Sequence, residues 1–551
     1  MRRQSTYQPV IAKVREWPLV KLNKRREEFL EAVIKKSIKA LLDSYTNKED
    51  LHLMLSKMIR SEQMRTEIKS WRADPSDDKI FWHNIESELV NSDEAVLHNM
   101  LSKIIERYVS EISGKFYVSH YNLGAKTVTH ALSRILRPVK FQNILSSTQV
   151  NNKLKDKIHI SGEVDKLRKL VVAGTVVMVP THFSHLDSAV IAWVIHNLGL
   201  PPFIYGAGLN LFNSKFFGYF MEKIGTYKVD RRKKNLVYLV TLQSYSCLAL
   251  QWGCHSLFYP SGTRSRSGSV ETNLKTGLLK TVADAQVNNF SQNGHNASKI
   301  FLVPITLNYP FVLEAPLLIR DHLEIADVIE KGVYEDNSHL YNILLSATNI
   351  ITKGSYISIT IGEAVDLFCN KVDINGNSYD SNGNFIEIHK KFNGNDSEVK
   401  FDYSKEGYTQ NLSKYIVDAH FKDSCVLPSQ LVAYVTFKLF SSNYPNLEFS
   451  ELFKLPTLDM IIEYEDLKIN FSKYRDAFLT LNVNGKIKVE NCLKNDNIDE
   501  LLKYGINNLG IYHAKKPILR RDDGKITTQD LATLYYYHNR LIGYDVEKYI
   551  E

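Results

Sequence analysis

Two stretches of the sequence hold residue types that can act together in catalysis. The first, Val179-Pro-Thr-His-Phe-Ser-His-Leu-Asp187, separates His182 from Asp187 by four residues. A carboxylate that accepts from one ring nitrogen of a histidine fixes the tautomer and leaves the other nitrogen as a base. His185 has no carboxylate at the same spacing, so we interpret it as a packing residue or a secondary polar contact.

The second stretch, Phe258-Tyr-Pro-Ser-Gly-Thr-Arg-Ser-Arg-Ser-Gly268, is a glycine-containing turn with two arginines. Arginine binds phosphate in a bidentate way, and a glycine lets backbone donors approach it. Each stretch alone is a weak signal, because such spacings and basic turns are common. Together they predict a site that moves a group onto a hydroxyl of an anionic molecule. The sequence contains no Walker, G-x-G-x-x-G or G-x-S-x-G motif, which argues against the common nucleotide-binding and serine-hydrolase sites.

Both stretches follow short apolar runs. Residues 170–179 predict a buried strand that leads to His182, and residues 188–197 predict an apolar helix directly after Asp187. Residues 256–259 predict a second strand ahead of the arginine turn. In an open α/β sheet, ligands bind where strands hand over to helices, so we expect the two stretches to meet at one sheet edge.

The rest of the chain predicts an α/β fold with helical regions on either side. Helical spacing of apolar residues appears at 27–42, 51–64 and 94–109. Short apolar runs then alternate with helical segments, and the strand candidates are 170–179, 202–205, 226–229, 256–259, 300–307 and 355–361. We therefore predict a helical N-terminal domain (1–140), an α/β catalytic domain (141–370), an Asn/Gly-rich insertion (371–405) and a mostly helical C-terminal region (406–551).

Three later segments give more local predictions. The spacing of Asp373, Asn375 and Asn377 is close to a calcium loop but lacks its glycine and glutamate, so a hairpin or surface insertion is the better interpretation. Residues 481–489 predict a hairpin around an Asn-Gly turn. The aromatic helix at 530–541 is expected either to pack on the core or to contact lipid.

Composition narrows the class of protein. A chain of 551 residues is too long for one core, and its five cysteines include no CxxC pair, which argues against zinc and disulfides and fits a reducing cytosol. We expect no signal peptide and no membrane-spanning helix. The net charge of +8 is typical of proteins that bind nucleic acid, anionic lipid surfaces or anionic substrates. Nucleic acid is disfavoured because the basic residues are spread along the chain.

The order of four blocks adds a family resemblance. The sequence resembles the signature of the glycerolipid acyltransferase superfamily in four blocks that follow one another in the same order. They are His182 to Asp187, Gly225-Thr-Tyr-Lys-Val-Asp-Arg-Arg232, the arginine turn and Val303-Pro-Ile-Thr306. Within this superfamily the chain looks most like the glycerol-3-phosphate acyltransferase branch. That branch is favoured by features outside the four blocks: the Ser-Arg-Ser-Gly extension with residues 274–279 after it, the Gly362-Glu363 pair and the terminal Leu534-Tyr-Tyr-Tyr-His-Asn539.

The resemblance implies transfer of an acyl group from acyl-CoA or acyl carrier protein to the 1-hydroxyl of glycerol 3-phosphate, with no metal or cofactor. His182 is then expected to be the general base and Asp187 its orienting carboxylate. The residues expected to bind substrate are Arg231, Gly262, Thr263, Arg264, Arg266 and Pro304. A lipid product implies a peripheral protein at the cytoplasmic face of a membrane. Residues 209–220 are the candidate contact, with burial in the core as the alternative.

Two positions depart from the family pattern and keep alternatives open. Ser261 stands where the third block usually has glutamate, and the Asp230-Arg231 ending of the second block is closer to the lysophosphatidate branch. The rivals are therefore a 1-acylglycerol-3-phosphate acyltransferase and a lipid-binding relative that has lost catalysis.

Overall fold

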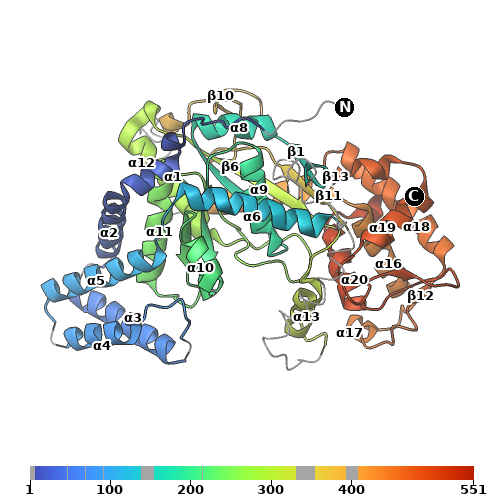
Figure 1. The fold of residues 1–551 in the computed structure, drawn as a ribbon, viewed down its shortest axis with the longest axis horizontal. Coiled ribbons are helices and arrows are strands. Elements are labelled where there is room, and N and C mark those ends of the chain that lie inside the picture. The colour runs from blue at the N-terminus through green and yellow to red at the C-terminus, as the bar shows by residue number, and fades with distance from the viewer. Residues whose placement is uncertain are drawn as a thin grey trace.

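A seven-stranded sheet forms the centre of the molecule (Figure 1). The computed structural model describes residues 7–45, 47–68, 70–90, 92–137, 154–213, 215–329, 354–391 and 407–550. In the described part the strand order is β1-β7-β6-β2-β5-β3-β4. The strands are β1 (Ile158–Gly162), β2 (Thr175–Pro180), β3 (Ile204–Gly208), β4 (Thr226–Val229), β5 (Ser256–Leu257), β6 (Ile300–Asn308) and β7 (Ile357–Ile361).

The direction of the strands creates one functional edge. β6, β2, β5, β3 and β4 run parallel to one another, while β7 is antiparallel to β6 and pairs in parallel with β1. The carboxyl ends of five neighbouring strands therefore meet at the same edge. The α/β fold class predicted from the sequence is confirmed.

Alternation along β2 shows how the two faces of the sheet are covered. Val176 and Met178 join the core cluster that includes α6 (Val118–Leu136) and α9 (Leu186–Asn197). Val177 and Val179 point to the other face, toward α11 (Leu236–Gln251), α12 (Thr276–Asn293) and α15 (Gly407–Asp423). Because β2 is buried on both sides, its sequence is apolar throughout rather than alternating.

Helical regions flank the sheet at its two ends, in blue and red in Figure 1. The N-terminal helices are α1 (Pro18–Lys24), α2 (Arg26–Leu42), α3 (Lys48–Ile68), α4 (Asp78–Leu89) and α5 (Glu94–Ile112), which bears out the predicted helical segments there. They share a core with β3, β4 and α11, in which Phe29 meets Tyr245 edge-on at 5.2 Å between ring centroids.

The C-terminal region shares a core with the sheet. Its main helices are α16 (Pro428–Ser442), α18 (Tyr464–Val483), α19 (Ile498–Asn508) and α20 (Leu531–His538). Leu534, Tyr536 and Tyr537 of α20 are fully buried, so this aromatic helix packs on the core. The remaining helices include α8 (Val164–Ala173), α10 (Lys215–Met221), α13 (Ala315–Ile325) and α17 (Phe449–Leu452).

Two sequence predictions were wrong in detail. The apolar run 170–179 is not one strand, because 170–173 ends helix α8 and the strand begins at Thr175, after Gly174. The predicted hairpin at 481–489 is also absent. Leu481 belongs to α18, Gly485 adopts a left-handed φ of +69° after the helix, and β13 (Lys488–Val489) pairs in parallel with β11 (Cys425–Val426). The first error arose because a short apolar run does not distinguish a helix end from a strand. The second arose because the Asn-Gly pair, a common hairpin turn, here follows the end of a helix.

The Asn/Gly-rich insertion forms a small antiparallel sheet, as the hairpin interpretation predicted. Its strands are β8 (Lys371–Val372), β9 (Ser378–Tyr379) and β10 (Phe385–Ile386). Asp373 and Asp380 each accept backbone N–H groups of their own turns, which satisfies these carboxylates locally. Residues 392–405 of the predicted insertion lie outside the described residues, and the four domain boundaries stay predictions.

Residues 209–220, the candidate membrane contact, divide between core and surface. Leu209 and Phe212 are buried with Met221, whereas Tyr219 is exposed. The side chains of residues 214–217 lie outside the described residues. Among the described helices, none has the length and apolar content needed to cross a bilayer.

We expect Gly268→Ala to destabilise the fold by about 2–3 kcal/mol. Gly268 has a φ of +89°, and a Cβ there would lie 2.2 Å from the carbonyl oxygen of Tyr536 in α20. Gly294 is the matched control, with a φ of +52° but no atom within 4 Å of the place a Cβ would occupy, so Gly294→Ala should cost about 1 kcal/mol. Urea unfolding measures both. Equal losses would show that α20 does not constrain this turn.

Candidate active site

His182 and Asp187 meet where β2 hands over to α9. The strand ends at Pro180, His182 lies in the loop, and Asp187 is the second residue of the helix. His182 Nδ1 is 2.8 Å from Asp187 Oδ2, as the sequence spacing predicted. A carboxylate only accepts, so Nδ1 carries the proton in this bond and Nε2 is left as an acceptor.

Asp187 is fully buried and its carboxylate is held by several donors. Oδ2 also accepts from the backbone nitrogens of Phe183 at 2.7 Å and Ser184 at 2.9 Å, while Oδ1 accepts from the Tyr309 hydroxyl at 2.6 Å. Burial, and after it the Asp187 charge, raises the pKa of Tyr309 well above its usual range, so this phenol remains a donor. Tyr309 follows β6 and was not anticipated from the sequence.

The arginine turn packs directly against His182. It leaves β5, the neighbour of β2 in the sheet, and the Ser265 nitrogen donates to the His182 carbonyl at 2.8 Å. The Tyr259 ring stacks on the imidazole, with 4.0 Å between ring centroids and 21° between the ring planes. The ring of His182 is therefore fixed by a hydrogen bond at one edge and by an aromatic face.

Arg231 reaches the same turn from β4. Its guanidinium donates to the Gly262 carbonyl at 2.6 Å, and Gly262 has a φ of +74°, which favours glycine. Burial, and after it the charge of Arg264, lowers the pKa of Arg231. Two like charges thus lie within electrostatic reach of each other beside the histidine. An anion between them would relieve that repulsion.

Glu314 connects the two stretches and was missed by the sequence analysis. It directly precedes α13; one carboxylate oxygen accepts from the Ser184 hydroxyl at 3.0 Å, and the other from the His185 nitrogen at 2.8 Å. The second oxygen also lies 3.4 Å from Arg264 Nη1. The His185 ring itself is largely exposed and only 4.0 Å from Glu314, consistent with a secondary polar contact.

The other predicted binding residues have different surroundings. Thr263 and Arg266 are exposed, and the charge of Arg266 acts on Glu271. Pro304 is buried within β6, opposite Val179 of β2, so it contacts the strand that carries His182 rather than the open space in front of it. The structure thus brings together His182, Asp187, Arg231, Gly262 and Arg264.

A small cleft opens beside the histidine, with about 230 Å³ of empty space. Its wall includes His182, Ser261, Glu271 and His420. Burial raises the pKa of Glu271 above its ordinary value, although Ser265 and Arg266 oppose the shift. Burial lowers the pKa of His420 to about 4, and its Nε2 donates to the Val179 carbonyl at 2.9 Å. The third block has Ser261 in place of the usual glutamate, but Glu271 supplies a carboxyl group to the same cleft.

The C-terminal end of the chain supports the turn from behind. Asn539 Nδ2 donates to the Ser267 carbonyl at 2.9 Å. Arg540 is buried, lies 3.3 Å from the centre of the Phe183 ring and donates to the Leu307 carbonyl at 3.2 Å. The sequence predicted an aromatic helix at 530–541 but not its contacts with the arginine turn. In the described ranges, no three His, Cys, Asp or Glu side chains form a group suited to a metal ion.

Glu271→Gln is expected to raise the melting temperature near about pH 7 and to leave it unchanged near about pH 4. The folded protein binds the Glu271 proton more tightly than the unfolded chain, because burial raises this pKa. Ionisation of Glu271 therefore costs folding free energy, and the cost grows as pH rises above the ordinary glutamate pKa of about 4.3. Thermal unfolding across this pH range measures the effect.

Glu28→Gln is the control for that prediction. Glu28 is exposed on α2, and its hydrogen bond with Arg25 lowers its pKa, so its substitution has the opposite sign and gives no gain at neutral pH. A gain that is the same at low and neutral pH in Glu271→Gln would contradict the prediction.

Comparison with known proteins gives a consistent picture of this region. Residues 159–308, which span β1 to β6, match the family model described as Acyltransferase. A glycerol-3-phosphate acyltransferase of Haemophilus ducreyi is 30% identical over 172 residues, 31% of this chain and 20% of the relative. One from Pseudoalteromonas atlantica is 28% identical over 176 residues, 32% of this chain and 21% of the relative.

A second group of relatives has a different name. A dihydroxyacetone phosphate acyltransferase of Homo sapiens is 27% identical over 252 residues, 44% of this chain and 34% of the relative. The chain thus spans between a fifth and about a third of the length of these curated relatives. The matched residues include the whole path from His182 to Pro304. The chain therefore carries an acyltransferase domain that is similar to those of glycerol-3-phosphate and dihydroxyacetone phosphate acyltransferases.

Proposed function

We propose that this protein transfers a fatty acyl group from acyl-CoA or acyl carrier protein to the sn-1 hydroxyl of glycerol 3-phosphate. The observation that carries the proposal is the His182–Asp187 pair, with 2.8 Å between Nδ1 and Oδ2, beside a cleft and two arginines. The names of the relatives, which specify glycerol 3-phosphate or dihydroxyacetone phosphate, support a small phosphorylated acceptor.

In the proposed reaction His182 acts on the acceptor hydroxyl. Nε2 takes the hydroxyl proton while the oxygen attacks the thioester carbonyl, and Asp187 stabilises the imidazolium that forms. The tetrahedral intermediate then breaks its carbon–sulfur bond, and the imidazolium returns the proton to the leaving thiolate. The products are an ester and a free thiol, so the protons balance without a cofactor.

The acceptor phosphate is proposed to lie between Arg231 and Arg264. Each guanidinium already has one acceptor, the Gly262 carbonyl for Arg231 and Glu314 for Arg264, and these contacts hold both at the turn. A phosphate dianion would offset the repulsion between them. Gly262, Thr263 and Arg266, in the same turn, are proposed to help hold this phosphate. Pro304 is proposed to shape the side of the site that binds the acyl donor, through its pairing in β6 with β2, the strand that leads to His182.

A 1-acylglycerol 3-phosphate acceptor is the second candidate. It is favoured by Asp230-Arg231, the ending that resembles the lysophosphatidate branch. That acceptor needs an apolar groove for its acyl chain in addition to a phosphate site. The assembled His182–Asp187 pair argues against a relative that has lost catalysis.

We expect purified wild-type protein to transfer labelled palmitate to glycerol 3-phosphate, and His182→Ala to lower kcat by about 10³-fold. Asp187→Asn should lower kcat nearly as much, because it removes the acceptor that fixes the imidazole. Palmitoyl-CoA and palmitoyl carrier protein are supplied in parallel, and glycerol 3-phosphate, dihydroxyacetone phosphate and 1-acylglycerol 3-phosphate are offered separately. Product chromatography identifies the acceptor.

His185→Ala is the matched control for the assay, since this exposed ring neighbours the site without an Asp187 contact. Its kcat should stay within a factor of about three of wild type. Label found only in phosphatidate would move the protein to the second candidate. Folded protein that transfers to none of the three acceptors would exclude the enzyme proposal.

We further propose that the protein works at the cytoplasmic face of a membrane as a peripheral protein. Tyr117, Leu123 and Tyr219 are exposed where the start of α6 meets α10, and Lys223 Nζ lies 3.5 Å from the centre of the Tyr219 ring. We call these four residues the α6–α10 patch. Exposed tyrosines and leucine beside a cation suit an anionic lipid surface.

Leu123→Asp combined with Tyr219→Asp should reduce co-sedimentation with vesicles of anionic phospholipid by about tenfold. The double substitution removes apolar area and adds negative charge facing the lipid. Leu458→Asp, at an exposed leucine of the C-terminal region, is the control and should leave binding unchanged. Equal loss in the control, or no loss in the double variant, would rule out this patch.

A further inference from the structure

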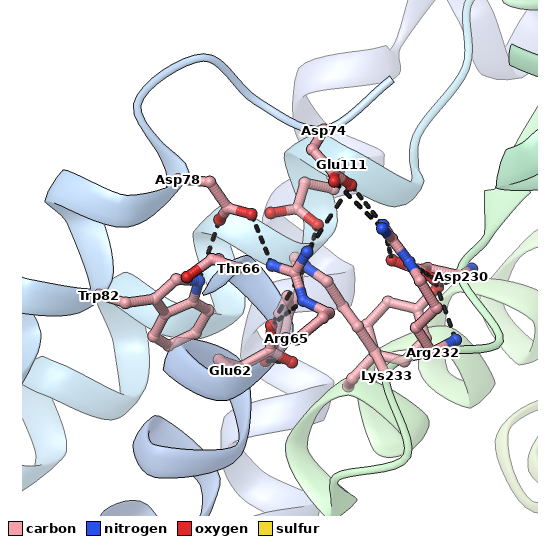
Figure 2. Close-up of polar contacts among 12 residues, drawn as sticks. Glu62, Arg65, Thr66, Asp74, Asp78, Trp82, Glu111, Asp230, Arg232 and Lys233 are labelled. Atoms are coloured by element: carbon pink, nitrogen blue, oxygen red, sulfur yellow. Dashed lines mark hydrogen bonds and ion pairs between the residues drawn. The ribbon is translucent and has the colours of Figure 1, made fainter. Parts of the chain in front are cut away.

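The residues that follow β4 extend in two directions. Arg231 donates to the Gly262 carbonyl of the arginine turn. Asp230, Arg232 and Lys233 instead form ion pairs away from the turn, and Arg232 and Lys233 reach residues of the N-terminal helical region (Figure 2). A single short segment thus connects the proposed phosphate site with helices that contribute no residue to the blocks of the acyltransferase signature.

Arg232 lies between carboxylates from the two regions. Its Nη1 donates to Asp74 Oδ2 at 3.1 Å, and its Nε and Nη2 donate to Asp230 Oδ1 at 2.9 Å and Oδ2 at 2.8 Å. The guanidinium also stacks over the Trp71 ring, 4.0 Å from its centre. Asp74 is itself fixed by the Trp71 nitrogen at 2.6 Å and lies 3.7 Å from Arg65.

Lys233 forms a second connection. Its side chain is 1% exposed, pairs with Glu111 of α5 and lies 3.8 Å from Glu62 of α3. Arg65 extends the network within the N-terminal region, donating to Glu62 at 2.7 Å and to Asp78 at 2.5 Å (Figure 2). The ion pairs therefore run without a break from α3 and α5 to the backbone beside Arg231.

Burial makes this network geometrically demanding. The side chains of Asp74 and Asp230 are 7% and 5% exposed. A buried charge is tolerated only where its partners are correctly placed, so each member restricts the position of the next. The backbone on both sides of Arg231 is held in this way, because Asp230 and Arg232 are its immediate neighbours.

Arg231 depends on such support from its backbone. Burial, and after it the like charge of Arg264, lowers the pKa of its guanidinium. Without an anion between them, electrostatics pushes the two arginines apart. Attachment of the flanking residues to the N-terminal helices opposes that displacement and keeps Arg231 aimed at the turn.

We propose that Asp74 is a positioning residue for the acceptor: by holding Arg232 and, through it, Asp230, it sets the place of Arg231 at the phosphate site. The inference rests on the proposed function, in which Arg231 binds the acceptor phosphate. The N-terminal helical region then completes the acceptor site without touching the acceptor.

Steady-state kinetics of Asp74→Asn test the proposal. The substitution keeps the size of the side chain and removes the charge that holds Arg232. We expect the KM for glycerol 3-phosphate to rise about tenfold, with kcat and the KM for palmitoyl-CoA unchanged within a factor of about two. Asp77→Asn is the matched control, because Asp77 lies in the same loop, is exposed and pairs with Arg107 instead. Its kinetics should equal those of wild type.

A double-mutant cycle separates positioning from a general structural effect. Arg231→Met alone should raise the acceptor KM, and Asp74→Asn should add nothing further once Arg231 is gone. Additive effects, or a loss of kcat that follows the loss of melting temperature, would overturn the proposal. An unchanged acceptor KM in Asp74→Asn would also overturn it while leaving the proposed function intact. Inactive wild-type protein would instead remove the proposed function itself.

Discussion

The buried carboxylate of Asp187 is the constraint on which the rest of the candidate site depends. Fully buried, it is held by the His182 ring, two backbone nitrogens of its own loop and the Tyr309 hydroxyl. These donors come from the loop that joins β2 to α9 and from the residue after β6. The parallel pairing of β2 with β6 is what brings them together, so the sheet topology and the chemistry of the histidine depend on each other.

The same principle governs the cations of the site. In the proposed reaction Arg231 and Arg264 both face an anionic substrate, a position in which their like charges repel each other. Glu314 restrains Arg264, and the ion pairs of Asp230 and Arg232 restrain the backbone of Arg231. Each carboxylate therefore offsets part of the repulsion between the two arginines and holds them at the turn.

The sequence predicted the parts of the site that are local in the chain. The His182–Asp187 contact follows from spacing alone, and the meeting of the two stretches follows from parallel strands whose carboxyl ends share an edge. Tyr309, Glu314 and Arg540 could not be found this way, because each reaches the site through tertiary packing and none stands in a motif. The start of β2 was misplaced for another reason, because an apolar helix end and a buried strand look alike in sequence.

The C-terminal region illustrates why long-range partners matter for a turn so rich in small and basic residues. Gly268 has a backbone conformation that favours glycine, and the carbonyl of Tyr536 lies where a side chain would stand. Asn539 and Arg540 then bind the carbonyls of Ser267 and Gly268. A turn with little apolar surface of its own cannot hold one shape by local interactions. Its geometry is set by α20 on one side and by His182 on the other, which places the arginines relative to His182, the proposed base.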